Sequence, residues 1–325
     1  MIVANSSVPC SMVTMKGLFD SSYYDTVARS NGEAYRIFVG GPSGQFVAAK
    51  APNSTDRYPV IYVLDGKLNF AMVHAQVQIL SAMHQMPPAY VIGIAYAGDE
   101  SFFEKDVFRR QADLTPNEGG ELEAQMKIMN RAEGTLFGGA AAFLSFLEGE
   151  LKPELAQAFP ISTTDATILG NSLGGLFPSW VLFHQPHLFQ RYVIVSPSWW
   201  WNNYEVCDWE TQYSVSHDDL PATVFATFGG LETAEKHRAI VEMNLRIASG
   251  DVKHALEQTL QRLDRLGWVR GAELIPEFRQ KLSSRHYPNL KLTAIALPEE
   301  THESIPGGGF SRGLRSVFGS WSPKD

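Results

Sequence analysis

A serine flanked by glycines is the strongest chemical feature of this 325-residue sequence. Ser172 lies in the pentapeptide Gly170-Asn171-Ser172-Leu173-Gly174, between the apolar runs 166–169 and 176–180. This order predicts a strand, a sharp turn and a helix, with glycines where a Cβ would clash in the tight crossing. Such a turn strains the serine backbone and lifts the hydroxyl clear of the sheet. We therefore predict that Ser172 is a covalent nucleophile.

The base that activates this serine is expected near the C-terminus. The turn resembles the nucleophile elbow of α/β-hydrolases, in which serine, acid and histidine follow one another along the chain. Histidines after the turn are His184, His187, His217, His237, His254, His286 and His302. His302 is the predicted base because it follows the last predicted strand, 291–297, at the edge where α/β sheets carry their sites.

An acid must orient the imidazole of His302 and stabilise its charged form. Glu232 directly follows the predicted strand 223–228, the strand before the last, and is the predicted acid. Asp208, one strand earlier, is the alternative. Glu232 would also suit the N-terminus of the helix expected from Ala234, where a carboxylate is stabilised by free N–H groups.

The developing oxyanion needs two backbone N–H donors. One is expected from Leu173, the residue after the nucleophile. The second is expected from Lys67, in the turn that follows an early strand. Backbone donors do not restrict the side chain, so these two positions rest on their place in the chain.

Three consecutive tryptophans, Trp199, Trp200 and Trp201, follow the strand after the elbow. They cannot all face one core, and we predict that they contribute to a pocket wall with large apolar contact area. Ordinary packing beneath a loop is the alternative for each of them.

The elements that position these residues form one α/β series. Continuous apolar runs predict strands buried on both faces, as in a mostly parallel sheet. These runs cover 58–64, 90–96, 166–169, 191–196, 223–228 and 291–297. A further strand is predicted at 34–39, where the residues alternate at period two. Helices are expected at 70–83, 140–159, 234–247, 252–266 and 311–318. Alternating strands and helices predict an α/β fold with helices on both faces of the sheet.

We expect a single domain over 1–325, with two inserted segments that overhang the site. The first is the polar stretch Gly98–Asn130, which is too long for a simple connection. The second is 233–290. These segments would select the substrate, since one fold can serve many esters.

Composition excludes several classes of protein. The formal charge of −8 and a pI near 5.6 argue against nucleic acid as the partner. Two cysteines, Cys10 and Cys207, rule out a disulfide framework and fit a reducing compartment. No run approaches the roughly 18 apolar residues of a membrane span, and Met1–Leu18 lacks the pattern of a signal peptide. A cytoplasmic enzyme is expected, and its oligomeric state is not predicted.

Four segments in this order resemble the esterase D-like branch of the α/β-hydrolases, and within it the siderophore esterases that cleave enterobactin-type trilactones. They are 170–177, 184–189, 196–201 and 302–306. Segment 63–66 resembles the oxyanion turn of that branch, and 109–116 resembles its "RDYTP"-like stretch. The resemblance implies hydrolysis of a small-molecule ester without metal or organic cofactor. It also implies that Arg109, with Arg110 and Lys67, supplies positive charge for an anionic ligand.

Three other functions remain open. A thioesterase of the S-formylglutathione hydrolase type would use the same residues, and thioester kinetics would identify it. An acyltransferase would replace water with a bound alcohol, which product analysis would detect. A non-catalytic binding module on a hydrolase fold is the third, and the presence of both Ser172 and His302 argues against it.

Overall fold

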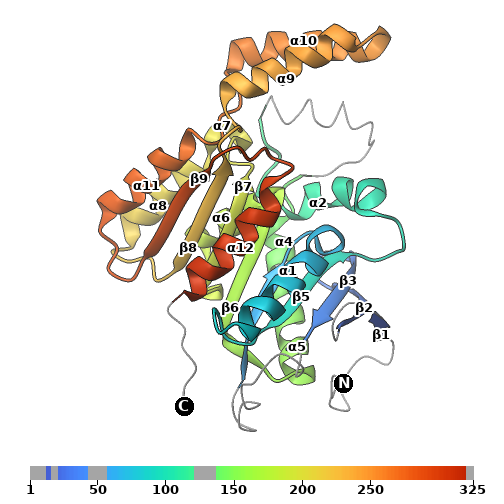
Figure 1. Ribbon diagram of the computed structural model, residues 1–325, viewed down its shortest axis with the longest axis vertical. Helices are drawn as coiled ribbons and strands as arrows, with labels where there is room; N and C mark the ends of the chain where they lie inside the picture. Colours follow the sequence, from blue (N-terminus) through green and yellow to red (C-terminus); the bar gives the residue numbers. More distant parts are fainter. Residues whose placement is uncertain (1–11, 16–20, 43–56, 121–136, 320–325) are drawn as a thin grey trace.

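The computed structural model describes residues 12–15, 21–42, 57–120 and 137–319. Its nine strands form one sheet in the order β1-β2-β3-β5-β4-β6-β7-β8-β9 (Figure 1). Along this order, neighbouring strands pair antiparallel from β1 to β5. Neighbouring strands pair parallel from β5 through β4 to β9. The strands are β1 (Val13–Met15), β2 (Ser21–Val27), β3 (Ala34–Gly40), β4 (Tyr58–Val63), β5 (Tyr90–Tyr96), β6 (Ile161–Ser172), β7 (Arg191–Pro197), β8 (Thr223–Gly229) and β9 (Lys291–Leu297).

Helices cover both faces of this sheet, which confirms the predicted α/β-hydrolase class. α1 (Gly66–Ala82) and α12 (Ile305–Phe318) enclose one apolar core. The opposite core is enclosed by α4 (Ala140–Phe146), α5 (Lys152–Ala158), α6 (Leu173–His184), α8 (Val206–Ser216) and α11 (Leu274–Arg285). The central parallel strands β4, β5 and β7 are buried along most of their length because helices cover both of their faces, whereas the edge strand β9 is only partly buried.

Two N-terminal strands were not predicted. β2 has the sequence Ser-Ser-Tyr-Tyr-Asp-Thr-Val, and its last residues are partly exposed. It pairs with β3 in full register, so neighbouring strands rather than apolar content define it. Cys10 and part of Met1–Leu18, where no signal peptide was expected, lie outside the described residues.

The polar stretch Gly98–Asn130 is not a plain loop. The π-helical turn Phe102–Asp106 leads directly into α2 (Val107–Asp113). Phe102 and Leu114 are buried at the two ends of this helical unit. The expectation that this stretch is more than a simple connection therefore agrees with the helical unit at 102–113, which was not itself predicted, while 121–130 lie outside the described residues.

The segment 233–290 divides into two parts. α9 (Ala234–Ile247) and α10 (Gly250–Leu266) form a hairpin beyond the carboxyl ends of the strands, at the top of Figure 1. α11, in contrast, packs on the sheet beside β9 and does not overhang the site. The two ends of the hairpin meet, since the Ala272 N–H donates to the Glu232 carbonyl at 2.8 Å and the Ala234 N–H to Glu273 Oε1 at 2.9 Å.

α2 is joined to the sheet through a buried carboxyl group. The hydroxyls of Tyr35 and Tyr96 donate to Asp113 Oδ2 at 2.6 and 2.7 Å. Burial raises the pKa of Asp113 to about 6 despite these two bonds. The folded protein therefore retains the Asp113 proton over a pH range in which the unfolded chain has lost it.

Asp113→Asn is expected to remove a pH-dependent part of the stability. The contribution of a raised carboxyl pKa is complete below about pH 4 and is lost as the pH rises through about 6. Wild type should lose up to about 3 kcal/mol relative to Asp113→Asn between these limits. Urea unfolding at several pH values measures the difference, with exposed Asp218→Asn as control. Parallel curves for wild type and Asp113→Asn would contradict the assignment.

Candidate active site

The turn around Ser172 joins β6 to α6 directly. Ser172 has φ 60° and ψ −125°, a strained backbone for a residue with a side chain. A Cβ on Gly170 would lie 2.2 Å from the Gly174 carbonyl oxygen, and one on Gly175 would lie 2.9 Å from the Pro197 Cα. Only glycine fits at these positions, so the sequence forces the sharp crossing that presents the Ser172 hydroxyl.

Ser172 lies beside the end of β7. It is paired with Pro197 in the sheet, and the Ser198 N–H donates to the Ser172 carbonyl at 3.0 Å. The hydroxyl itself makes no hydrogen bond to His302 within the described part of the chain. Such bonds are often loose in unliganded hydrolases and shorten when the substrate binds.

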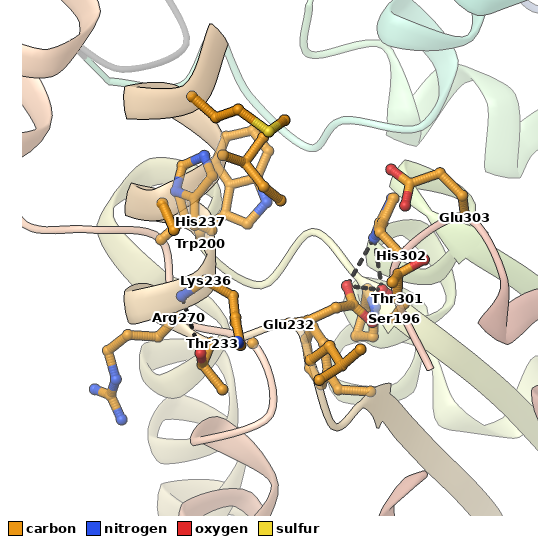
Figure 2. A pocket seen from close by; sticks show the side chains of 18 residues that line it. Ser196, Trp200, Glu232, Thr233, Lys236, His237, Arg270, Thr301, His302 and Glu303 are labelled. Carbon is orange, nitrogen blue, oxygen red and sulfur yellow. Dashed lines mark hydrogen bonds and ion pairs between the residues drawn. The ribbon is translucent and has the colours of Figure 1, made fainter. Parts of the chain in front are cut away.

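The structure brings Glu232 and His302 together at the same edge of the sheet (Figure 2). Glu232 follows β8, His302 follows β9, and His302 Nδ1 lies 2.8 Å from Glu232 Oε2. The other carboxylate oxygen, Oε1, accepts the Gly229 N–H at 2.7 Å. Because a carboxylate only accepts, this contact favours the tautomer with the proton on Nδ1, and Nε2 makes no hydrogen bond within the described residues.

Asp208 lies elsewhere. It is exposed in the first turn of α8, and it makes no hydrogen bond or ion pair with His302 among the described residues. Of the two carboxylates weighed from the sequence, Glu232 is the one in contact with the imidazole.

The turn after β4 leads into α1 through Asp65, whose backbone is left-handed at φ 55°. Lys67 is in the first turn of α1 and Leu173 is the first residue of α6. First-turn N–H groups have no acceptor within their own helix, so both are available to a ligand. The Lys67 side chain is engaged elsewhere, because its Nζ donates to Asp106 Oδ1 at 2.9 Å and to the Glu100 carbonyl at 2.8 Å.

Arg110 connects the two turns. Its guanidinium donates to both oxygens of Asp65 at 2.7 Å, and Nη2 also reaches the Asn171 carbonyl at 3.2 Å. The Arg110 and Asp65 side chains are only 9% and 3% exposed. This ion pair is therefore shielded from water, and it sets the distance between the elbow and the turn that carries Lys67.

Arg110→Met is expected to destabilise the protein by about 3 kcal/mol and to lower kcat. The substitution leaves the Asp65 carboxylate buried without its partner, and it releases the elbow carbonyl. Arg109→Met is the matched control, because Arg109 is 46% exposed and its ion pair with Glu33 should contribute less than about 1 kcal/mol. Thermal unfolding and ester hydrolysis measure both effects, and equal losses in the two variants would contradict this role.

A pocket of about 590 Å³ opens beside the Glu232–His302 pair. Pro197, the sheet neighbour of Ser172, lines it together with Ser196, Glu232 and His302. Its apolar walls come from Trp200, Phe228, Leu231, Ile240, Met243 and Val269. Figure 2 shows the cations Lys236 and Arg270 across the pocket from the pair. Burial lowers the pKa of His237, so this pocket imidazole is neutral at pH 7.

The family model described as "Putative esterase" matches residues 33–224 of the chain. The chain belongs to this esterase family. It is a carboxylic ester hydrolase. A serine in a sharp turn and a histidine–carboxylate pair are the groups that such an enzyme is expected to use.

Several similar proteins are named as esterases or hydrolases. The ferri-bacillibactin esterase BesA of Bacillus subtilis is 33% identical over 220 residues, 65% of this chain and 70% of BesA. The siderophore triacetylfusarinine C esterase of Aspergillus fumigatus is 26% identical over 269 residues, 81% of this chain and 82% of that one. The crystal structure of the BES protein of Bacillus cereus superposes with a TM-score of 0.67 at 25% identity, covering 96% of this chain and 99% of that one. Siderophore hydrolase EstA of Aspergillus nidulans shares the fold, with a TM-score of 0.66 at 22% identity over 94% and 96% of the two chains.

The tryptophan prediction for this esterase needs correction at two positions. Trp200 lines the pocket, but Trp199 and Trp201 are each 1% exposed and belong to the core. Their indole N–H groups donate to Ser179 Oγ at 2.8 Å and Asn117 Oδ1 at 3.0 Å. Three adjacent residues point in different directions, and the sequence does not show which of them faces the cavity.

The residues expected to supply positive charge do not line this pocket. Arg109 pairs with Glu33 and does not line the pocket, while Arg110 and Lys67 are bound to Asp65 and Asp106. The pocket cations are Lys236, in the first turn of α9, and Arg270, which follows α10. Sequence reasoning missed them because nothing in their spacing shows which side chains face a cavity.

Ser196 was overlooked as a site residue. Its hydroxyl donates to Glu232 Oε2 and lies 2.7 Å from His302 Nδ1. Its place at the end of the strand after the elbow, on the same edge as the other site residues, was the available signal.

Proposed function

We propose that this esterase hydrolyses the backbone ester bonds of a siderophore through an acyl-enzyme at Ser172. The observation that carries the chemistry is the meeting of four parallel strand ends, where Ser172 of β6 is paired with Pro197 of β7, and the Glu232–His302 pair follows β8 and β9. The substrate class is supported by the relatives named as siderophore esterases.

In this mechanism the Ser172 Oγ attacks the ester carbonyl carbon while His302 Nε2 takes its proton. Glu232 holds Nδ1–H and stabilises the imidazolium. The N–H groups of Lys67 and Leu173 bind the oxyanion. His302 then gives the proton to the departing alcohol as the carbon–oxygen bond breaks. Water, deprotonated by the same nitrogen, attacks the acyl-enzyme and releases the acid.

The pocket suits a bulky ligand with negative charge. Its volume of about 590 Å³ lies within the usual range for small-molecule sites, and its walls are mainly apolar and aromatic. Lys236 has no carboxylate partner among the described residues, so its charge is available to an anionic group. Arg270 adds a second charge, although it also pairs with Glu277.

A cytoplasmic location is part of the proposal, supported by the presence of only two cysteines. Among the described residues, no helix combines the length and the apolar character that crossing a membrane requires.

An ester panel tests the proposal. Purified protein is assayed with a trilactone siderophore, its ferric complex, p-nitrophenyl acetate and an acyl thioester, with and without added alcohol. We expect the highest kcat/KM for one of the siderophore esters, with the free acid as product. Preference for the thioester, or transfer of the acyl group to alcohol, would replace siderophore hydrolysis with one of the alternative activities.

A further inference from the structure

A second serine lies between the acid and the base. Ser196, at the end of β7, is fully buried, and its Oγ contacts both Glu232 Oε2 and His302 Nδ1 (Figure 2). The distance from Ser196 Oγ to Nδ1 is 2.7 Å, against 2.8 Å from Glu232 Oε2 to the same atom. The imidazole proton therefore has two acceptors at equal range.

Only one arrangement of protons satisfies all three groups when Glu232 is ionised. The carboxylate cannot donate, so the Ser196 hydroxyl proton is directed at Oε2. The Ser196 oxygen is then left as an acceptor toward His302, and Nδ1–H is shared between Oγ and Oε2. Ser196 thus supports the tautomer in which Nε2 is free to take a proton.

The carboxylate is fixed from two sides in this arrangement. Oε1 is held by the Gly229 N–H, and Oε2 is held by the Ser196 hydroxyl. The His302 side chain is 41% exposed, so packing alone does not immobilise it. Without the hydroxyl, Oε2 would be restrained only by this exposed partner.

Backbone conformation gives no reason for a serine at this position. Ser196 has φ 41°, a region that favours glycine and costs a residue with a Cβ about 1 kcal/mol or more. A strained residue whose side chain joins two other site residues points to a role for that side chain.

We propose that Ser196 is a positioning residue that acts through Glu232, fixing the carboxylate and the Nδ1–H tautomer of His302. This proposal rests on the proposed hydrolytic function. It assigns Ser196 no contact with the substrate, so its loss should lower kcat and leave KM nearly unchanged.

A double-mutant cycle tests the dependence on Glu232. Ser196→Ala should lower kcat about tenfold in the wild-type background and less than about twofold in Glu232→Ala, because the hydroxyl then has no carboxylate to hold. Ser81→Ala is the matched control, since the hydroxyl of this buried serine near the far end of α1 donates to the Pro87 carbonyl at 3.1 Å, away from the site. Equal losses in both backgrounds, or no loss in either, would overturn the proposal.

Placing a carboxylate at position 196 gives a second test. The expected change in kcat has opposite signs in wild type and in Glu232→Ala. Asp is among the residues that best tolerate positive φ, and at position 196 its carboxylate would reach Nδ1. Ser196→Asp should lower kcat in wild type, through repulsion from Glu232, but raise it about tenfold in Glu232→Ala. A decrease in both backgrounds would show that position 196 cannot act on the imidazole.

An NMR measurement provides a readout without turnover. The Nδ1–H proton of His302 should give a sharp downfield resonance in wild type and Ser81→Ala, and a broadened one in Ser196→Ala. An unchanged resonance would contradict the positioning role. If Ser172→Ala retains activity, the hydrolytic mechanism itself fails, and that outcome is independent of every Ser196 measurement.

Discussion

Ser172→Ala should abolish hydrolysis of p-nitrophenyl acetate while the protein remains folded. Without the hydroxyl no acyl-enzyme forms, and kcat is expected to fall about 10⁴-fold or more. The alanine keeps the Cβ and the surrounding glycine contacts, so circular dichroism and the melting temperature should stay close to wild type. Mass spectrometry after incubation with an ester should show an acyl adduct on wild type alone.

Ser172→Gly provides a sharper control for the fold. Glycine adopts φ 60° without strain, so this variant should be equally inactive and about 1 kcal/mol more stable than wild type. Activity near wild type in either variant would exclude Ser172 as the nucleophile. Loss of stability in the glycine variant would show that the turn is not strained.

Glu232→Ala is expected to lower kcat about a thousandfold, whereas Asp208→Ala should change it by less than about twofold. Glu232 lies 2.8 Å from His302 Nδ1, and its loss removes the group that orients the imidazole and stabilises its charge. Asp208 is exposed on α8, so its replacement should leave kcat nearly unchanged. Steady-state kinetics at a fixed pH compare the two variants.

Glu232→Gln separates charge from shape in the same assay. The amide keeps the size of the side chain but can present its NH₂ group to Nδ1, which favours the wrong imidazole tautomer. A loss similar to that of Glu232→Ala is expected. A large effect of Asp208→Ala with a small effect of Glu232→Ala would move the acid one strand earlier along the chain.

The sequence predicted the sheet well where strands contain runs of mainly apolar residues. Tyr90–Tyr96 and Lys291–Leu297 match their predicted bounds because apolar runs of this length leave little choice of conformation. The site residues on strand ends, Ser172 and His302, followed from chain order and from the edge they share. β2 was missed because its polar residues are held by pairing with β3, a long-range effect that no local pattern shows.

Side-chain direction limited the prediction of the pocket. Arg109 and Arg110 are adjacent on α2, yet one is exposed and the other is buried against Asp65. A difference of one residue on a helix turns a side chain by roughly 100°, and a single sequence does not show where the neighbouring element lies. The same ambiguity affected the three tryptophans, of which only Trp200 reaches the pocket.

The closed base of the α9–α10 hairpin has a consequence for how such an enzyme could acquire new substrates. The chain leaves the sheet edge at Glu232 and returns beside it at Ala272, so the hairpin is attached at a single point. Insertions with adjacent ends can be exchanged at low cost to the host fold. A hairpin grafted from another esterase between Thr233 and Gly271 would replace one wall of the pocket and its Lys236 and Arg270 charges. The four strand ends that carry Ser172, Ser196, Glu232 and His302 would stay in place.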